Sequence, residues 1–152
     1  MNTEPLQKVG SITSTNGAEI TAFDAVSNRL FVVAGSIIEI QKLSNKGALS
    51  ADGSLLTGFT SPAGTEAIPN SVAVKNGIVA VAYAIQDTTT KAQLPGRVSF
   101  YNAASGAFLN AVAVGALPDM LTFTPMAPKY WWLMKANQIA TGKQTPSIQK
   151  DR

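Results

Sequence analysis

The chain has 152 residues, of which 45% are hydrophobic and 14% charged, and it contains neither cysteine nor histidine. This length can bury a real core, but disulfides, the usual zinc sites and catalytic dyads or triads with a histidine base are excluded. No apolar run reaches the roughly 18 residues of a membrane-spanning helix, so we expect no such segment.

The net charge of +3 is unevenly distributed. Up to Pro125 there are seven basic and eight acidic residues, whereas residues 126–152 contain five basic residues and one acidic residue. A nucleic-acid-binding domain needs a basic face, so we expect no nucleic-acid partner. Residues 1–13 lack the basic start and apolar stretch of a signal peptide, and the chain as written is expected to stay in the cytoplasm.

Short apolar or alternating runs separated by turn residues are typical of an all-β protein. Polar loops are expected over Ser44–Gly53 and Gln86–Pro95. The runs predict strands over Leu6–Thr13, Glu19–Ala25, Leu30–Ala34, Ile37–Leu43, Leu55–Phe59, Ser71–Val74, Ile78–Tyr83, Arg97–Asn102, Ala107–Val114 and Met120–Phe123.

The strongest local signal is a hairpin over Pro69–Tyr83, where Asn76-Gly77 separates two of these runs. Asn-Gly favours the two-residue hairpin turn, because both residues tolerate a positive φ.

The strand pattern begins again near Glu19, Asn70 and Asp119, at intervals of about 50 residues. Four short antiparallel strands per repeat are typical of β-propeller blades, although many short strands at regular spacing also fit a Greek-key sandwich. The internal repeat favours an all-β partial β-propeller, with about two four-stranded antiparallel blades plus the first strand of a third.

The corresponding domain division has three parts. Residues 1–17 form an N-terminal strand or arm, and residues 18–125 form the propeller fragment. Blade one covers about residues 18–60, blade two about 69–115, and blade three starts at 117–125. Two blades leave open sheet edges and an uncovered apolar face, so we expect marginal stability and self-association at the edges.

Four aspartates are candidates for a cation site, because hard cations prefer clustered oxygen ligands. Their spacing fits no EF-hand loop, and each lies beside a turn, where aspartate accepts local hydrogen bonds. We therefore interpret them as turn residues and assign no metal ligand and no cofactor. The four are Asp24, Asp52, Asp87 and Asp119.

The loop Thr88-Thr89-Thr90 with Lys91 offers contacts to a phosphate, but a solvated loop is the simpler interpretation, and no glycine-rich phosphate motif is found. Tyr101 and Asn102 are expected to end a strand, and Asn70 and Ser71 to cap the start of the hairpin. No catalytic or cofactor-binding residue is assigned.

Four stretches resemble one family, the bacterial choice-of-anchor I propeller domain, which is similar to mesenchyme-specific cell-surface glycoprotein. Members are longer, usually secreted or surface-attached, and some are labelled alkaline phosphatase. The resemblance implies a seven-blade-like propeller outside the cell. It allows calcium as a cofactor of intact members only and gives no support for calcium in this chain. The stretches are Ala18–Val33, Pro69–Ala82, Pro95–Asn102 and Leu109–Pro125.

The resemblance is expected to end at Pro125. The family continues T-P-D-G-x-K-V-L-V-A-N-E-G-E-P-N, whereas this chain continues M-A-P-K-Y-W-W-L-M-K-A-N-Q. If one G is inserted before the Met126 codon, the back-translated frame agrees with the family at every forced position. We therefore expect residues 126–152 to be an out-of-frame tail; the alternative is a genuine C-terminal extension.

The tail contains Tyr130-Trp131-Trp132-Leu133-Met134 between Lys129 and Lys135. This pattern resembles a membrane-interface anchor or an aromatic platform for nucleic acid. As an out-of-frame product it has no selected partner, and its aromatic residues are expected to collapse onto the open sheet edge, where they bury area.

The expected function is a non-catalytic fragment of an extracellular or cell-surface propeller that presents loops to an unknown ligand or surface. The alternative is part of a secreted alkaline-phosphatase-like or phosphodiesterase-like enzyme. Metal-dependent phosphate chemistry needs clustered carboxylates and often histidine, so an active site of that kind is expected outside this fragment.

Overall fold

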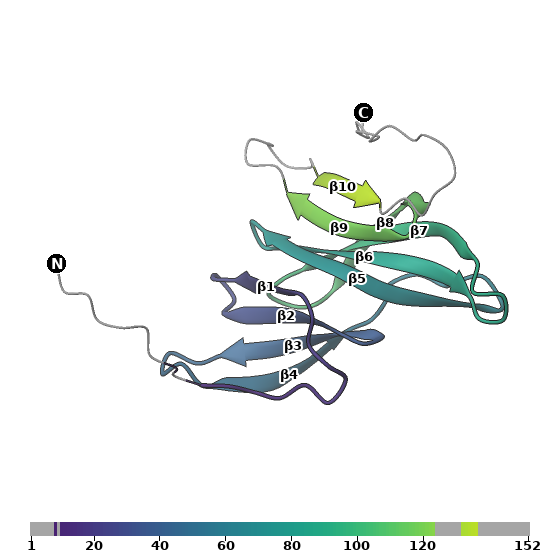
Figure 1. Cartoon of the computed structure of the whole chain (residues 1–152). Coiled ribbons are helices and arrows are strands. Elements are labelled where there is room, and N and C mark those ends of the chain that lie inside the picture. The colour runs from purple at the N-terminus through teal and green to yellow at the C-terminus, as the bar shows by residue number, and fades with distance from the viewer. Residues whose placement is uncertain (1–7, 9, 124–131, 137–152) are drawn as a thin grey trace.

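The computed structural model describes residue 8, residues 10–123 and residues 132–136. Within them the chain forms ten strands in three antiparallel sheets (Figure 1). Sheet one has the order β1-β2-β3-β4, sheet two β5-β6-β7-β8, and sheet three pairs β9 with β10. The strands are β1 (Thr21–Asp24), β2 (Arg29–Ala34), β3 (Ile37–Leu43), β4 (Leu49–Leu55), β5 (Thr65–Lys75), β6 (Ile78–Asp87), β7 (Gln93–Asn102), β8 (Phe108–Ala116), β9 (Pro118–Phe123) and β10 (Trp132–Ala136).

The all-β class and the two four-stranded antiparallel sheets are confirmed. Sheet three starts where the third repeat was predicted, and β10 adds a second strand to it. That strand falls within the aromatic segment that was expected to collapse onto a sheet edge, and it does pair with the edge of β9.

The predicted hairpin is confirmed at the junction of β5 and β6. Lys75 pairs with Ile78 across a turn in which Asn76 and Gly77 have φ values of 51° and 76°. Positive φ at both central residues is the requirement of the turn that matches the twist of the flanking strands. Both strands are longer than predicted, because proline and polar residues in β5 conceal its alternation.

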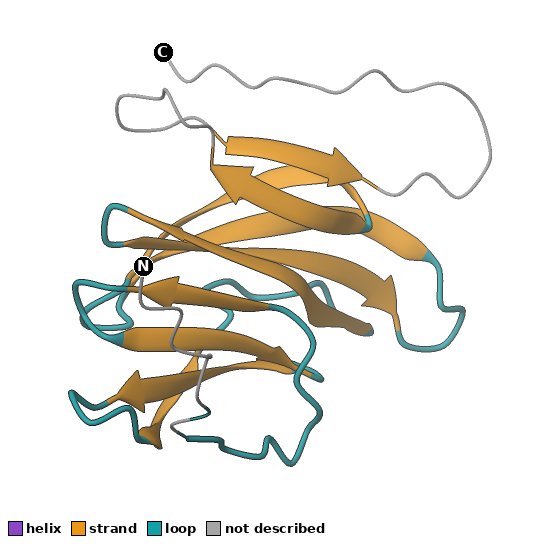
Figure 2. Cartoon of the chain, turned by 60° about the vertical axis from the view of Figure 1, so that its left-hand side comes forward, coloured by secondary structure: helices purple, strands orange, loops and turns teal. Residues whose placement is uncertain are grey.

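Sheets one and two pack face to face (Figure 2). β6 contributes side chains to two hydrophobic cores, one on each of its faces. Val79, Val81 and Tyr83 point toward sheet one, and Ala80 and Ala82 point toward β9. A strand buried on both faces has a continuous apolar sequence, which explains the run from Ile78 to Ile85. Sheet one contributes Phe31, Val33, Ile38, Ile40 and Leu55 to the first core, and Leu121 of β9 joins Val98 in the second.

An extra residue occurs in the middle of β5, near the start of β9 and just before β1. Asn70 interrupts the pairing of β5 with β6, and Asp119 interrupts that of β9 with β10. In sheet one the amide of Glu19 donates to the carbonyl of Val33, whose own amide donates to Ile20, so two residues again oppose one. These bulges coincide with the three predicted repeat starts. The first strands are also neighbours in space, since β5 contacts both β1 and β9.

Two strand predictions are wrong. The fourth strand of sheet one is β4 and not Leu55–Phe59, so half of the predicted loop Ser44–Gly53 is strand. β4 is an edge strand that is mostly polar and exposed, and it therefore lacks an apolar signal. The described part of Leu6–Thr13, residue 8 and residues 10–13, forms no strand, because Gly10 and its polar neighbours provide no apolar face.

Candidate functional site

The most structured side-chain cluster lies where the connection between sheets one and two, residues 56–64, passes over β7. Arg97, Ser99 and Tyr101 alternate along β7 and share one face, because alternate residues of a strand point the same way. Ser99 Oγ donates to the carbonyl of Thr57 over 2.8 Å. Tyr101 Oη donates to the carbonyls of Leu56 and Thr57 at 2.6 and 3.0 Å. The connection is therefore fixed by side chains of sheet two.

Tyr83 and Tyr101 form a buried hydroxyl pair beneath this connection, with their oxygens 3.3 Å apart. Tyr101 directs its single proton to the backbone carbonyls, so Tyr83 is the donor within the pair. Burial raises the pKa of both phenols; for Tyr101, hydrogen bonds to Tyr83 and Ser99 oppose part of the rise. Both phenols are therefore neutral at physiological pH, and the pair holds structure and does not serve as a general base.

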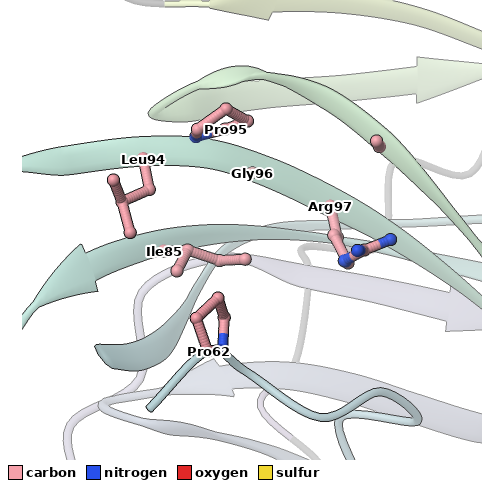
Figure 3. A pocket seen from close by; sticks show the side chains of 7 residues that line it. Pro62, Ile85, Leu94, Pro95, Gly96 and Arg97 are labelled. Atoms are coloured by element: carbon pink, nitrogen blue, oxygen red, sulfur yellow. The ribbon is translucent and has the colours of Figure 1, made fainter. Parts of the chain in front are cut away.

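A pocket of about 240 Å³ opens beside this cluster (Figure 3). The connection supplies Pro62, while the distal ends of sheet two supply the other walls. Gly96 is required for the packing behind it, since a Cβ there would lie 2.6 Å from the carbonyl oxygen of Tyr83. The lining residues are Pro62, Ile85, Leu94, Pro95, Gly96, Arg97 and Ala113.

Arg97 provides the formal charge in this pocket. Its guanidinium carbon lies 5.6 Å from the centre of the Phe59 ring, a cation–π arrangement that orients the side chain. No carboxylate among the described residues forms an ion pair with it; the two ion pairs there are Arg29–Asp52 and Lys91–Glu66. A guanidinium with its donors available beside apolar walls can bind a small anion that has an apolar body.

The four candidate aspartates lie apart, and no metal-binding cluster of acidic side chains occurs in the described ranges. Asp24 accepts the amide of Ser27 and Asp87 accepts the amides of Thr89 and Thr90, so both are turn residues as predicted. Asp52 instead forms an ion pair of 2.7 Å with Arg29, which corrects its interpretation as a turn residue. Asp119 is exposed at the bulge of β9.

The threonine loop is organised by internal contacts. The amides of Thr89 and Thr90 hold the pKa of Asp87 below its ordinary value, with Thr90 the larger cause. Lys91 lies 3.3 Å from Glu66, so its charge is already balanced within the fold. These contacts support the interpretation as a solvated loop over that of a phosphate site.

Asn70 and Ser71 connect sheets two and three and do more than cap a hairpin. Asn70 Nδ2 donates to the carbonyl of Pro118 at 3.3 Å, and Ser71 Oγ accepts the amide of Leu121 at 3.1 Å. Asn102 ends β7 as predicted and accepts the amides of Ala104 and Ser105. Lys129, Tyr130 and Trp131 lie outside the described residues.

Sequence reasoning missed Arg97, Ser99 and Tyr83 as a group. The alternation R-V-S-F-Y in β7 was a usable signal, because it places Arg97, Ser99 and Tyr101 on one face. Tyr83 pairs with Arg97 because of the register of β6 against β7, and the sequence alone did not predict that register.

The chain was compared with known proteins. The model of the choice-of-anchor I domain family matches residues 19–137. Neither a search of curated proteins nor a search of solved structures found a match. The match runs 12 residues past Pro125, so the expectation that the resemblance ends at Pro125 is wrong. The out-of-frame origin of residues 126–152 stays a prediction. Because the matched region covers most of its length, the chain belongs to the choice-of-anchor I domain family.

Proposed function

We propose that this chain is part of a β-propeller that acts outside the cell or on its surface as a binding or structural module. The observation that carries the proposal is the packing of successive sheets along their first strands, in which β5 contacts both β1 and β9. Blades of a propeller are arranged in this way around a central axis.

The proposed ligand position is the Arg97 pocket, and the proposed ligand class is a small organic anion. Chemical shifts of ¹⁵N-labelled protein titrated with benzoate provide the test, and millimolar affinity is expected for so few ligand atoms. Arg97→Gln should abolish the shifts around Ile85 and Ala113. Lys91→Gln removes a cation of the β6–β7 loop that pairs with Glu66, and it should leave the titration unchanged. Equal binding by both variants refutes the site.

The enzymatic alternative has a direct assay. The chain is incubated with a phosphate monoester and with added divalent metals, and release of phosphate is measured. No turnover is expected, because a metal-dependent phosphatase needs a cluster of carboxylates around its ions. Metal-dependent turnover that survives repurification would replace the binding proposal with the enzymatic one.

We also propose that residues 126–152 are read out of frame and that the propeller continues in the restored frame. Sequencing the locus provides the first test: a continuous, homologous open frame should appear when one G is restored after the Pro125 codon. A gene repaired in this way should give a compact, disc-like particle in small-angle scattering. Absence of a downstream homologous frame would refute the frameshift, and an elongated particle would refute the propeller.

The described residues contain no helix of the length and apolarity that crossing a bilayer requires. A surface location of the intact protein is proposed from the family alone, whose members are usually secreted or attached.

A further inference from the structure

The bulge aligns the three first strands residue by residue. Taking Glu19, Asn70 and Asp119 as equivalent, the second residue after the bulge is Thr21, Val72 or Leu121. The fourth residue is Phe23, Val74 or Phe123. Because alternate residues share a face, each pair points to the same side of its own sheet.

In sheets two and three this side packs on the preceding sheet. Val72 is buried in the core shared with sheet one, and Val74 packs against the same core. Leu121 and Phe123 take the same roles in the core shared with sheet two. In sheet one the equivalent positions lack such a neighbour: Thr21 is exposed and the Phe23 side chain is 44% exposed. The β1 row of sheet one is therefore an unfilled sheet-packing surface, which we call the leading face. Val32 and Ala34 of β2, on the same side of the sheet, are buried.

The opposite side of each first strand packs on the following sheet. Ala22 packs against the core between sheets one and two, and Ala73 against the core between sheets two and three. Ser71 accepts the amide of Leu121 on that side. The equivalents in β9 are Met120, which is 54% exposed, and Thr122, which is also exposed. We call this surface the trailing face.

The N-terminal arm leaves the leading face accessible along β1. Ser14 and Asn16 donate to Glu39 at 2.9 and 3.4 Å, so the arm lies over β3 on the side of sheet one that faces away from sheet two. Contacts between successive sheets run chiefly along the first strands. The part of sheet one that another sheet would use is therefore the part that the arm does not cover.

We propose that a second copy of this chain docks its trailing face on the leading face of the first. The contact would repeat between molecules the sheet packing that occurs twice within each molecule. The central contacts are Met120 and Thr122 of one copy against Thr21 and Phe23 of the next. These side chains are uncharged, so the contact brings no like charges together. The interface is heterologous, and it joins copies head to tail.

The test is sedimentation equilibrium of the full chain with Phe23→Glu and Met120→Glu, each checked for a folded circular dichroism spectrum. The wild-type mass should rise with concentration. Each single variant buries a charge at the centre of the interface, and association should weaken about 30-fold or more. Val26→Glu alters a side chain that is 89% exposed in the turn after β1, and it should associate like the wild type.

An equimolar mixture of the two variants decides the arrangement. Phe23→Glu keeps an intact trailing face and Met120→Glu keeps an intact leading face, so the mixture should form a heterodimer. It should grow no further, because the two altered faces both carry a glutamate and repel each other. A wild-type mass that is constant over all concentrations overturns the proposal. Association that survives both single variants also overturns it, in favour of pairing at the β4 or β8 edge. A mixture that stays monomeric overturns the head-to-tail geometry.

Discussion

Replacing Tyr101 with phenylalanine tests whether the hydroxyl cluster ties the two large sheets together. The change removes the oxygen that donates to the carbonyl of Leu56 and accepts from Tyr83. It keeps the ring, which packs edge-on at 5.9 Å against Phe108. The loss in stability therefore reports on hydrogen bonding and not on the volume of the side chain.

The expected magnitude follows from what each partner loses. The bond to the connection contributes about 1 kcal/mol, the usual net value for such a bond. The hydroxyl of Tyr83 is then buried without a partner, which costs roughly 1–3 kcal/mol. The carbonyl of Thr57 retains Ser99 as a donor. Tyr101→Phe should therefore lower the free energy of unfolding by about 2–4 kcal/mol.

Tyr83→Phe should cost less, about 1 kcal/mol, because Tyr101 keeps its bonds to the backbone. The double variant should be more stable than Tyr101→Phe by about 1 kcal/mol, since removing the second hydroxyl also removes the buried group without a partner. Urea unfolding followed by circular dichroism measures all four proteins, and unchanged m-values show that only stability has changed.

Additive losses would refute the reasoning. If the double variant is the least stable of the four, the two hydroxyls act separately, and the buried pair is not the unit described above. If Tyr101→Phe costs less than about 0.5 kcal/mol, its bonds to the connection contribute nothing net.

Three further changes probe other parts of the fold. Gly58→Ala places a Cβ against the Phe108 ring at a φ of 77°, and it should lower the free energy of unfolding in urea by about 3 kcal/mol. Gly64→Ala, at a φ of 76° with open space around it, should show only the conformational cost of about 1 kcal/mol. Equal costs would refute the steric account. Arg29→Ala removes an ion pair and donors to two carbonyls of the turn after β7, and a loss of about 1–2 kcal/mol in the same assay is expected. The pKa of Asp87 is lowered in the folded protein. Its contribution to stability is therefore present above the ordinary pKa of 3.8 and is lost as the pH falls through the lower folded pKa. Asp87→Asn should flatten this part of the curve of stability against pH, measured by urea midpoints.

Local signals carried most of the fold prediction. Asn76-Gly77 fixes a turn through its own backbone preferences, and the repeat starts at Glu19, Asn70 and Asp119 are visible because an apolar or alternating run follows each of them. β4 was misplaced because an exposed edge strand needs no apolar face. The sequence around Leu55–Phe59 is apolar for another reason: Phe59 fills the space between sheets and packs edge-on against Tyr83.

The candidate site was less predictable, since it depends on where the connection crosses sheet two. Arg97 is one cation in a strand until Phe59 and Pro62 are brought beside it. That placement depends on hydrogen bonds between residues more than 40 positions apart. The spacing of residues along the chain does not predict such long-range contacts.

The same separation in sequence has a consequence for the order of folding. Each four-stranded sheet is a run of consecutive hairpins, so its contacts are short-range and form early. The bond from Tyr101 to Leu56 spans 45 residues and can close only after sheet two has formed. We therefore expect the bonds to the connection to form late and to be absent from the transition state for folding. Weakening these bonds should speed unfolding while leaving the folding rate nearly unchanged. The connection would then determine the lifetime of the packed arrangement of the two sheets.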